Sequence, residues 1–300
     1  MPASEIALPL RIGARTVWTL RRRLVRRALT LEDALAGRLP ALPPLGADDD
    51  GYLVTSLPAA LVPRLADQAK GLRPFVRQRY ARNFARLDLG FDEYLAGFSS
   101  KSRSTLRRKA KKLAERSGGS LDLRCYRTPD EIERFHADAR AQSARTYQER
   151  LLDAGLPSGP EAIAEMREKA RRDQLRAWLL FVDGRPISYL YAPAEGDTLI
   201  YAYLGYDPNH AEYSPGTVLQ LEAMRQLMAE GRFRLFDFTE GEGQHKRQFA
   251  TGGIDCVDLL LVRPTAANLF TGWALNGFDG AVAAAKRAVG AGWVRRRLRG

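Results

Sequence analysis

The stretch that decides the fold runs from Thr198 to Phe238 and reads TLIYAYLGYDPNHAEYSPGTVLQLEAMRQLMAEGRFRLFDF. Its first ten residues are rich in aromatic and aliphatic side chains, which favours a strand. The segment 215–231 begins with proline and stops at glycine, as helices often do, and 233–238 is again an apolar strand. This order predicts a pair of parallel strands flanking the helix.

The flanking segments place this pair in a larger mixed sheet. Further strands are expected at 120–127, 175–184, 186–196 and 254–264, and helices at 128–150 and 159–174. Residues 11–30 fit either a strand or a basic helix, and 73–89 are expected to be extended. The predicted fold class is α/β (α+β), with a mixed, mostly antiparallel sheet flanked by helices.

Changes in composition along the chain predict four parts. Residues 1–50 form a basic arm that ends in the Pro/Gly/Asp-rich loop PALPPLGADDD. Residues 51–119 form an α/β subdomain that ends in a basic helix. The regular pattern of strands and helices fills 120–265, and 266–300 is an amphipathic basic helix.

The net charge of +12 is distributed unevenly over the 300 residues. Residues 1–120 carry 23 Lys and Arg against 11 Asp and Glu, whereas the last fifteen residues carry 6 against none. The basic runs 101–112 and 286–300 therefore predict contact with an anionic polymer or a membrane surface. The alternative is that both runs are solvated faces.

Several classes of protein are excluded by the residues that the sequence lacks. Its two cysteines, Cys125 and Cys256, lie far apart, and its three histidines show no HxxxH spacing, so no metal site is expected. The sequence contains no GxSxG motif, so a serine hydrolase is not expected. The start lacks the pattern of a signal peptide, and no apolar run is long enough to span a membrane. A cytoplasmic protein is expected, either free or peripheral on the inner membrane face.

The segment YSPGT (213–217) opens the helix that follows the strand at 198–207. A helix N-terminus presents free backbone N–H groups, which bind phosphate. Gly216 permits close approach, and the hydroxyls of Ser214 and Thr217 add donors. The alternative is an ordinary helix start.

These motifs carry a resemblance to a known family. Residues 205–250 resemble the CelD/BcsL-type (cellulose-biosynthesis) acetyltransferases of the GNAT superfamily, in which a Y-S-P-G-T segment opens the cofactor helix. The stretch FDFTEGEGQHKRQF (236–249) matches the family pattern F-D-F-x-x-G-(D/E)-x-x-Y-K-x-x-F, with His245 where tyrosine is usual. Only Gly216 clearly fits the usual GNAT pyrophosphate motif.

A second resemblance lies upstream. The stretch KSRSTLRRKAKKL (101–113) is similar to the basic helix of the Fem-type aminoacyltransferases. The N-terminal subdomain thus resembles half of a Fem-like double fold. Together the two resemblances cover roughly residues 75–265.

The GNAT resemblance implies a donor and a set of site residues. The donor is acetyl-CoA or another acyl-CoA, lying between the strands at 198–207 and 233–238, and no metal is implied. Glu240 or Glu242 is the expected base, and the further catalytic candidates are Asp237, Tyr203 and His245. The expected cofactor-binding residues are Gly205, Tyr213, Ser214, Gly216, Thr217 and Lys246.

Three functions remain open from the sequence. The first is transfer of an acyl group from acyl-CoA to an amine of a sugar, lipid or peptide precursor of the cell envelope or an exopolysaccharide. The second is Fem-like transfer from aminoacyl-tRNA to a cell-wall precursor, in which case a nucleic acid is a partner. The third is a catalytically silent GNAT-fold scaffold at the membrane.

Overall fold

The computed structural model describes residues 2–12, 15–143, 155–241 and 243–297; its description leaves out the side chains of 244, 245, 279 and 283–297. The chain forms two compact units. The first comprises Met1–Ala81 and Ile254–Gly300, and the second comprises Arg82–Gly253. The boundaries between them fall within the strands β4 (Arg73–Arg86) and β11 (Gly252–Val262).

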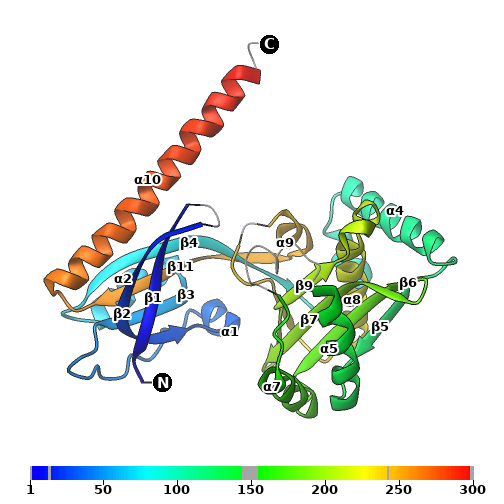
Figure 1. Ribbon diagram of the computed structural model, residues 1–300, viewed down its shortest axis with the longest axis horizontal. Coiled ribbons are helices and arrows are strands. Elements are labelled where there is room, and N and C mark those ends of the chain that lie inside the picture. The colour runs from blue at the N-terminus through cyan, green and yellow to red at the C-terminus, as the bar shows by residue number, and fades with distance from the viewer. Residues whose placement is uncertain (1, 13–14, 144–154, 242, 298–300) are drawn as a thin grey trace. The chain divides into compact units, whose positions relative to one another are not determined.

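The first unit contains a sheet in the order β1-β2-β3-β11-β4 (Figure 1). Its other elements are β1 (Ser4–Ile12), β2 (Arg15–Ala28), α1 (Leu31–Leu35), β3 (Gly51–Pro58), η1 (Ala59–Leu61), α2 (Val62–Gln68) and α10 (Ala266–Arg297). The ambiguous stretch 11–30 therefore contributes a strand, and β2 pairs with β3 in parallel. Leu275 of α10 packs with Leu24 and Leu260 on one face of this sheet. No described helix is both long and apolar enough to cross a membrane.

The second unit contains the order β4-β10-β8-β7-β6-β5, with β9 paired to β7. Its elements are α3 (Phe91–Ala96), α4 (Ser100–Arg116), β5 (Asp122–Tyr126), α5 (Pro129–Ser143), α7 (Pro160–Arg171), β6 (Leu175–Val182), β7 (Arg185–Glu195), β8 (Thr198–Ile200), β9 (Tyr203–Tyr206), η2 (Pro208–Tyr213), α8 (Pro215–Glu230), β10 (Leu235–Asp237) and α9 (Gln244–Phe249). β8 and β10 pair in parallel, and β7 pairs antiparallel with its neighbours. The predicted GNAT-like mixed sheet is confirmed.

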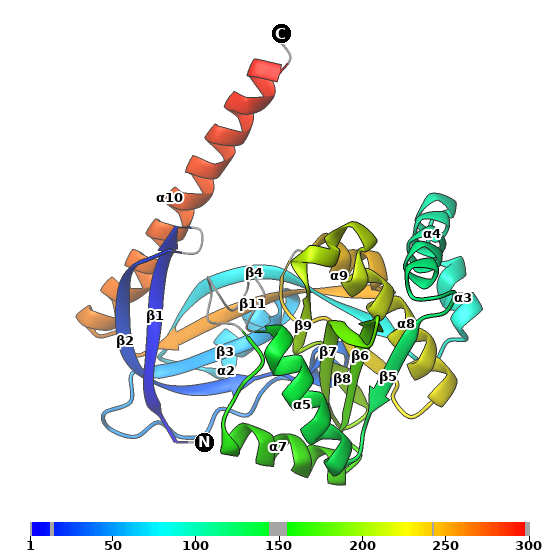
Figure 2. The same cartoon turned by 45° about the vertical axis from the view of Figure 1, so that its right-hand side comes forward.

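Helices cover both faces of the sheet in the second unit (Figures 1 and 2). On one face, Met224 of α8 and Leu106 of α4 pack with Trp178 of β6. On the other face, Phe135 of α5 and Met166 of α7 pack in a separate apolar cluster with the β6 and β7 side chains. The sheet is therefore buried on both sides.

The strand predicted at 198–207 is interrupted, so that prediction was wrong in detail. Leu199 of β8 pairs with Ala194 of β7, whereas Tyr203 of β9 pairs with Tyr191. From Leu199 to Tyr203 the chain advances four positions, while its partner β7 advances only three, from Ala194 to Tyr191. One extra residue on one strand is a β-bulge. Because of the extra residue, Tyr201 packs in the α8-side cluster, while Tyr203 packs on the α5 side.

A buried ion pair holds β10 against β4. The guanidinium of Arg82 donates from Nη2 to Oδ2 of Asp237 at 2.5 Å and from Nε to the same oxygen at 3.1 Å. The Asp237 side chain is 1% exposed and that of Arg82 is 10% exposed. Beside this pair, Asp237 lies opposite Phe84 in the antiparallel ladder.

Removing one partner of this pair should destabilise the second unit strongly. We expect Arg82→Met to lower the free energy of unfolding by about 3–5 kcal/mol, because it leaves the Asp237 carboxylate buried without a counter-ion. The double variant Arg82→Met/Asp237→Asn should recover part of this loss. The measurement is urea unfolding. Arg86→Gln is the control, since Arg86 is exposed on the same strand and pairs with the exposed Asp88. A cost for Arg82→Met no larger than that of the control would contradict the account.

Candidate functional site

The bulge marks the point at which the chain stops pairing with β10, as β8 does, and continues as β9, which pairs with β7 alone among the described strands. The backbone N–H of Tyr201 still donates to the carbonyl of Asp237 at 2.8 Å. Beyond Tyr201 and Ala202, β9 pairs with β7 and lies off the main strand order. Among the described residues, no strand pairs with the β10 side of β9, so its backbone groups there can pair with a ligand. We call this feature the strand parting.

The first turn of α8 packs against β9 beside the strand parting. A Cβ on Gly216 would lie 3.0 Å from Cδ2 of Leu204 and 3.6 Å from Cδ1 of Tyr206, both on β9. A Cβ on Gly205 would lie 2.4 Å from Cε1 of Tyr189. Packing against the Tyr189 ring therefore requires glycine at 205, whereas at 216 a larger residue would need Leu204 to shift by a few tenths of an ångström.

The N-terminus of α8 carries two side-chain hydroxyls, those of Ser214 and Thr217. Ser214 is in the left-handed region (φ 52°), and its carbonyl accepts from the N–H groups of Thr217 and Val218. The side chain of Ser214 makes no capping hydrogen bond. Within the described part of the chain, neither this hydroxyl nor that of Thr217 has a hydrogen-bond partner. Both are half-buried and free to bind an anion.

Gln220 of α8 presents an unsatisfied amide. Its side chain is 3% exposed, and neither Oε1 nor Nε2 has a partner among the described residues. Gln220 follows Gly216 by four positions, so both lie on the helix face that meets β9. An unpaired buried amide is costly unless a ligand satisfies it. The residues therefore fit a ligand that carries amide groups as well as phosphate.

The loop between β10 and α9 closes the other side of the site. Thr239 adopts a positive φ of 60°, and its N–H donates to Oδ1 of Asp237 at 2.8 Å. Gly241 has φ 115°, a conformation that glycine adopts readily. The ammonium of Lys246 donates to the carbonyl oxygen of Glu240 at 2.6 Å and contacts Oγ1 of Thr239 at 3.3 Å.

Lys246 and Tyr201, which lie beside the strand parting, both have pKa values shifted by burial. The ammonium of Lys246 lies 5.7 Å from the centre of the Tyr201 ring. Burial lowers the pKa of Lys246, against the opposing charges of Glu240 and Asp237. Burial also raises the pKa of Tyr201, so that its hydroxyl stays protonated. Lys246 is therefore a cation held partly out of water at the edge of the strand parting.

The predicted site residues fall into distinct environments. Asp237 is engaged by Arg82, and Glu240 is exposed. Tyr203 lies on the α5 side with its ring 6.1 Å from that of Tyr191, and the Tyr213 ring lies 4.7 Å from the Lys112 ammonium. Two expectations fall outside the described residues: Glu242 and the side chain of His245. Among the described residues, no three His, Cys, Asp or Glu are placed to hold a metal ion.

Three residues of the site were not predicted from sequence, namely Arg82, Tyr201 and Gln220. The signal for Gln220 was available, since a glutamine interrupts the apolar run VLQLEAM on a helix that packs on a sheet. No local signal marked Arg82, whose partner lies 155 positions away.

The lowered pKa of Lys246 predicts a pH dependence of stability. Between that pKa and 10.5, the ordinary value, the unfolded chain binds more protons than the folded chain. The contribution of Lys246 to the free energy of unfolding should therefore rise with pH in this window. We expect the free energy of unfolding of wild type, minus that of Lys246→Met, to increase in urea unfolding as the pH rises towards 10.5. A difference that is flat or falls with pH would contradict the desolvation of Lys246.

Comparison with known proteins gives the family of the second unit. Residues 100–247 match the family described as "Acetyltransferase (GNAT) domain". No curated protein sequence matches the chain.

Solved structures show the same fold. FemX aligns over 87% of this chain and 88% of its own, with TM-score 0.54 and 10% identity. The C-terminal domain (DUF2156) of an Agrobacterium fabrum protein described as a lysylphosphatidylglycerol synthetase aligns over 75% and 72%, with TM-score 0.51 and 15% identity. A conserved protein from Bacteroides thetaiotaomicron aligns over 71% and 70%, with TM-score 0.50 and 12% identity. At these identities the likeness concerns the fold alone. Residues 100–247 thus form a GNAT-type acetyltransferase domain, and the chain is an enzyme of the N-acyltransferase class.

Proposed function

We propose that the chain transfers an acyl group, most simply acetyl, from acyl-CoA to an amine, as a CelD/BcsL-type member of the GNAT superfamily. The observation that carries this proposal is the strand parting at Tyr201 and Ala202 beside the first turn of α8. It offers unpaired strand backbone next to a helix N-terminus, which suits a long donor with amides at one end and phosphates at the other.

The donor would be held by residues from three elements. The hydroxyls of Ser214 and Thr217 and the backbone at Gly216 would bind its pyrophosphate, with Tyr213 and Gly205 alongside. The amide of Gln220 would pair with an amide of the pantetheine arm. Lys246 would bind a donor phosphate or a carboxylate of the acceptor.

The reaction requires one proton acceptor and one proton donor. Glu240 or Glu242 would take the proton from the acceptor ammonium, and the amine nitrogen would then attack the thioester carbonyl. Backbone N–H groups of β9 would stabilise the oxyanion while the carbon–sulfur bond breaks. A tyrosine would protonate the leaving thiolate, and the second proton of the attacking nitrogen, lost as the amide forms, would restore that tyrosine. Tyr203 or Tyr213 is the candidate from sequence, whereas the packing of Tyr201 on the α8 side with Phe238 favours Tyr201. Asp237 would hold the loop in place, and His245 would take the packing role of the tyrosine it replaces.

The acceptor in this proposal is an amine on a sugar, lipid or peptide precursor of the cell envelope or an exopolysaccharide. A cytoplasmic protein that contacts the inner membrane face or an anionic polymer through residues 101–112 and 286–300 would meet such precursors. The fold shared with FemX and with the DUF2156 domain supports a second candidate, aminoacyl transfer from aminoacyl-tRNA. The match to an acetyltransferase family favours acyl-CoA.

A thiol-release assay tests the function. Acetyl-CoA with an amino sugar, an aminolipid in vesicles or a peptide amine should release free CoA only when the chain and an acceptor are both present. No affinity for CoA, together with salt-sensitive tRNA binding through residues 101–112, would replace this function with aminoacyl transfer. If the chain neither binds CoA nor binds tRNA, but binds vesicles through residues 286–300, the remaining function is that of a scaffold.

Glu240→Gln should lower kcat by about 10²–10⁴-fold, because the base is lost, while the affinity for acetyl-CoA stays unchanged. The assay above gives kcat, and calorimetry gives the affinity. Glu195→Gln, which neutralises an exposed glutamate at the end of β7, is the matched control. An unchanged kcat in Glu240→Gln would exclude Glu240 as the base.

Gln220→Met should raise stability and weaken donor binding together. Removing a buried amide without partners should raise the free energy of unfolding by about 1–3 kcal/mol. The same change should weaken acetyl-CoA binding. Gln226→Met on the same helix is the control, because it removes the acceptor of the Trp178 indole N–H and should destabilise the fold. Lower stability with unchanged affinity in Gln220→Met would contradict the assigned role.

A further inference from the structure

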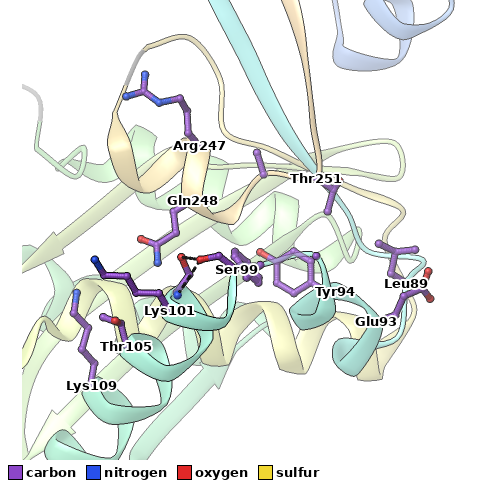
Figure 3. A pocket seen from close by; sticks show the side chains of 14 residues that line it. Leu89, Glu93, Tyr94, Ser99, Lys101, Thr105, Lys109, Arg247, Gln248 and Thr251 are labelled. Atoms are coloured by element: carbon purple, nitrogen blue, oxygen red, sulfur yellow. Dashed lines mark hydrogen bonds between the residues drawn. The ribbon is translucent and has the colours of Figure 1, made fainter.

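A cavity of about 860 Å³ lies in the second unit, bordered by residues of α3, α4 and α9 (Figure 3). Sites for small organic ligands commonly have volumes of about 300–1,000 Å³. None of the described residues proposed above for acyl transfer lines this cavity. The proposed acyl transfer at the strand parting therefore does not explain which residues line this cavity.

One wall of the cavity is cationic. Lys101, Thr105 and Lys109 recur at four-residue intervals on α4, so they share one face of that helix. Figure 3 shows the two lysines on the same side of the cavity with Thr105 between them, and Gln248 reaching from α9 towards Lys101. Arg247 of α9 also borders the cavity, and Figure 3 shows its guanidinium directed away from the two lysines.

These groups have no partners among the residues that the structure describes. Across the described ranges, Lys101, Lys109 and Arg247 make no ion pair, and the side chains of Thr105 and Gln248 make no hydrogen bond. Other lysines of α4 differ in this respect, since Lys111 approaches Glu115 and Lys112 approaches Glu212.

The cavity has one carboxylate, Glu93, which Figure 3 places at the opposite end from Lys101. The cationic end therefore has an excess of positive charge and free hydrogen-bond donors. Such a combination suits a phosphate group.

Another part of the lining is aromatic, formed by Tyr94 and Phe98. The rings of Tyr94 and Phe98 meet edge to face at 5.1 Å, and Phe98 meets Phe249 at 6.2 Å. The Tyr94 hydroxyl donates to the carbonyl of Phe249 at 2.7 Å, which ties α3 to the end of α9. A ligand with an anionic end and an uncharged organic part would match both walls.

We propose that this cavity binds the phosphate group of an organic phosphate, with Lys101 and Lys109 as its counter-ions and Thr105 and Gln248 as hydrogen-bond partners. Two sources supply this chemistry: the ribose 3′-phosphate of the acyl donor, and a phosphorylated acceptor. The site itself does not depend on the proposed acyl transfer.

Calorimetric titration of the full chain with inorganic phosphate, CoA and 3′-dephospho-CoA tests the proposal. Lys101→Gln/Lys109→Gln should bind inorganic phosphate at least about tenfold more weakly than wild type, because two charge-assisted contacts are lost. Arg107→Gln is the matched control, since Arg107 is an exposed residue of α4 outside the cavity lining, and it should bind as wild type does. Thermal unfolding followed by circular dichroism verifies that both variants fold.

The CoA arms identify the source of the phosphate. A loss of affinity for CoA in the double variant, with unchanged affinity for 3′-dephospho-CoA, assigns the site to the donor. If CoA and 3′-dephospho-CoA bind with equal affinity in every variant, while the double variant loses binding of inorganic phosphate, the site is assigned to the acceptor. Equal phosphate binding by wild type and the double variant, or no phosphate binding by wild type, overturns the proposal. These readouts need no turnover, so a failure of acyl transfer is distinguishable from a failure of this site.

Discussion

The ion pair between Arg82 and Asp237 fixes the end of β10, and the candidate site is arranged around that end. Asp237 meets Arg82 through its carboxylate, accepts the N–H of Tyr201 through its carbonyl, and accepts the N–H of Thr239 through Oδ1. The first contact joins β10 to β4, the second joins it to the residue after β8, and the third turns the chain into the loop that carries Glu240. One buried residue, through its side chain and its carbonyl, thus sets the positions of three neighbouring segments.

The strand parting follows from a single extra residue. Tyr201 is the last residue to bond β10, and the bulge at Ala202 sends Tyr203 to the opposite face of the sheet. Gly216 then allows α8 to approach the side of β9 that carries Leu204. Bulges next to active sites commonly re-aim side chains and end pairing, and here the bulge does both. The unsatisfied amide of Gln220 is a cost to folding that a bound donor would offset.

Much of the fold could be predicted from the sequence, because its signals are local. Apolar periodicity predicted the helix at 215–231 and its two flanking strands, and β8 and β10 confirm their parallel pairing. The start of α5 is likewise held by a contact between near neighbours in sequence, since the Glu131 carboxylate accepts the N–H groups of Arg127 and Thr128. The bulge could not be predicted in this way, because its register is set by pairing with β7 and leaves the composition of the strand unchanged.

Long-range contacts account for the remaining gaps. Arg82 was one arginine among many in a basic segment, and only the folded chain brings it to Asp237. The units themselves join segments distant in sequence, since residues 254–300 belong with residues 1–81. The sequence nevertheless indicated the motifs YSPGT and FDFTEGEG, which the fold brings to the two sides of the strand parting. The roles of Glu240, Glu242 and His245 remain predictions from the family resemblance.

The most direct test of the central claim is amide hydrogen exchange on the full chain with and without acetyl-CoA. If the donor lies in the strand parting, acetyl-CoA should slow exchange in β9, in the first turns of α8 and in the loop that follows β10, with little change in β5 and α7. Slowed exchange confined to other segments, or no change at saturating acetyl-CoA, would contradict the account.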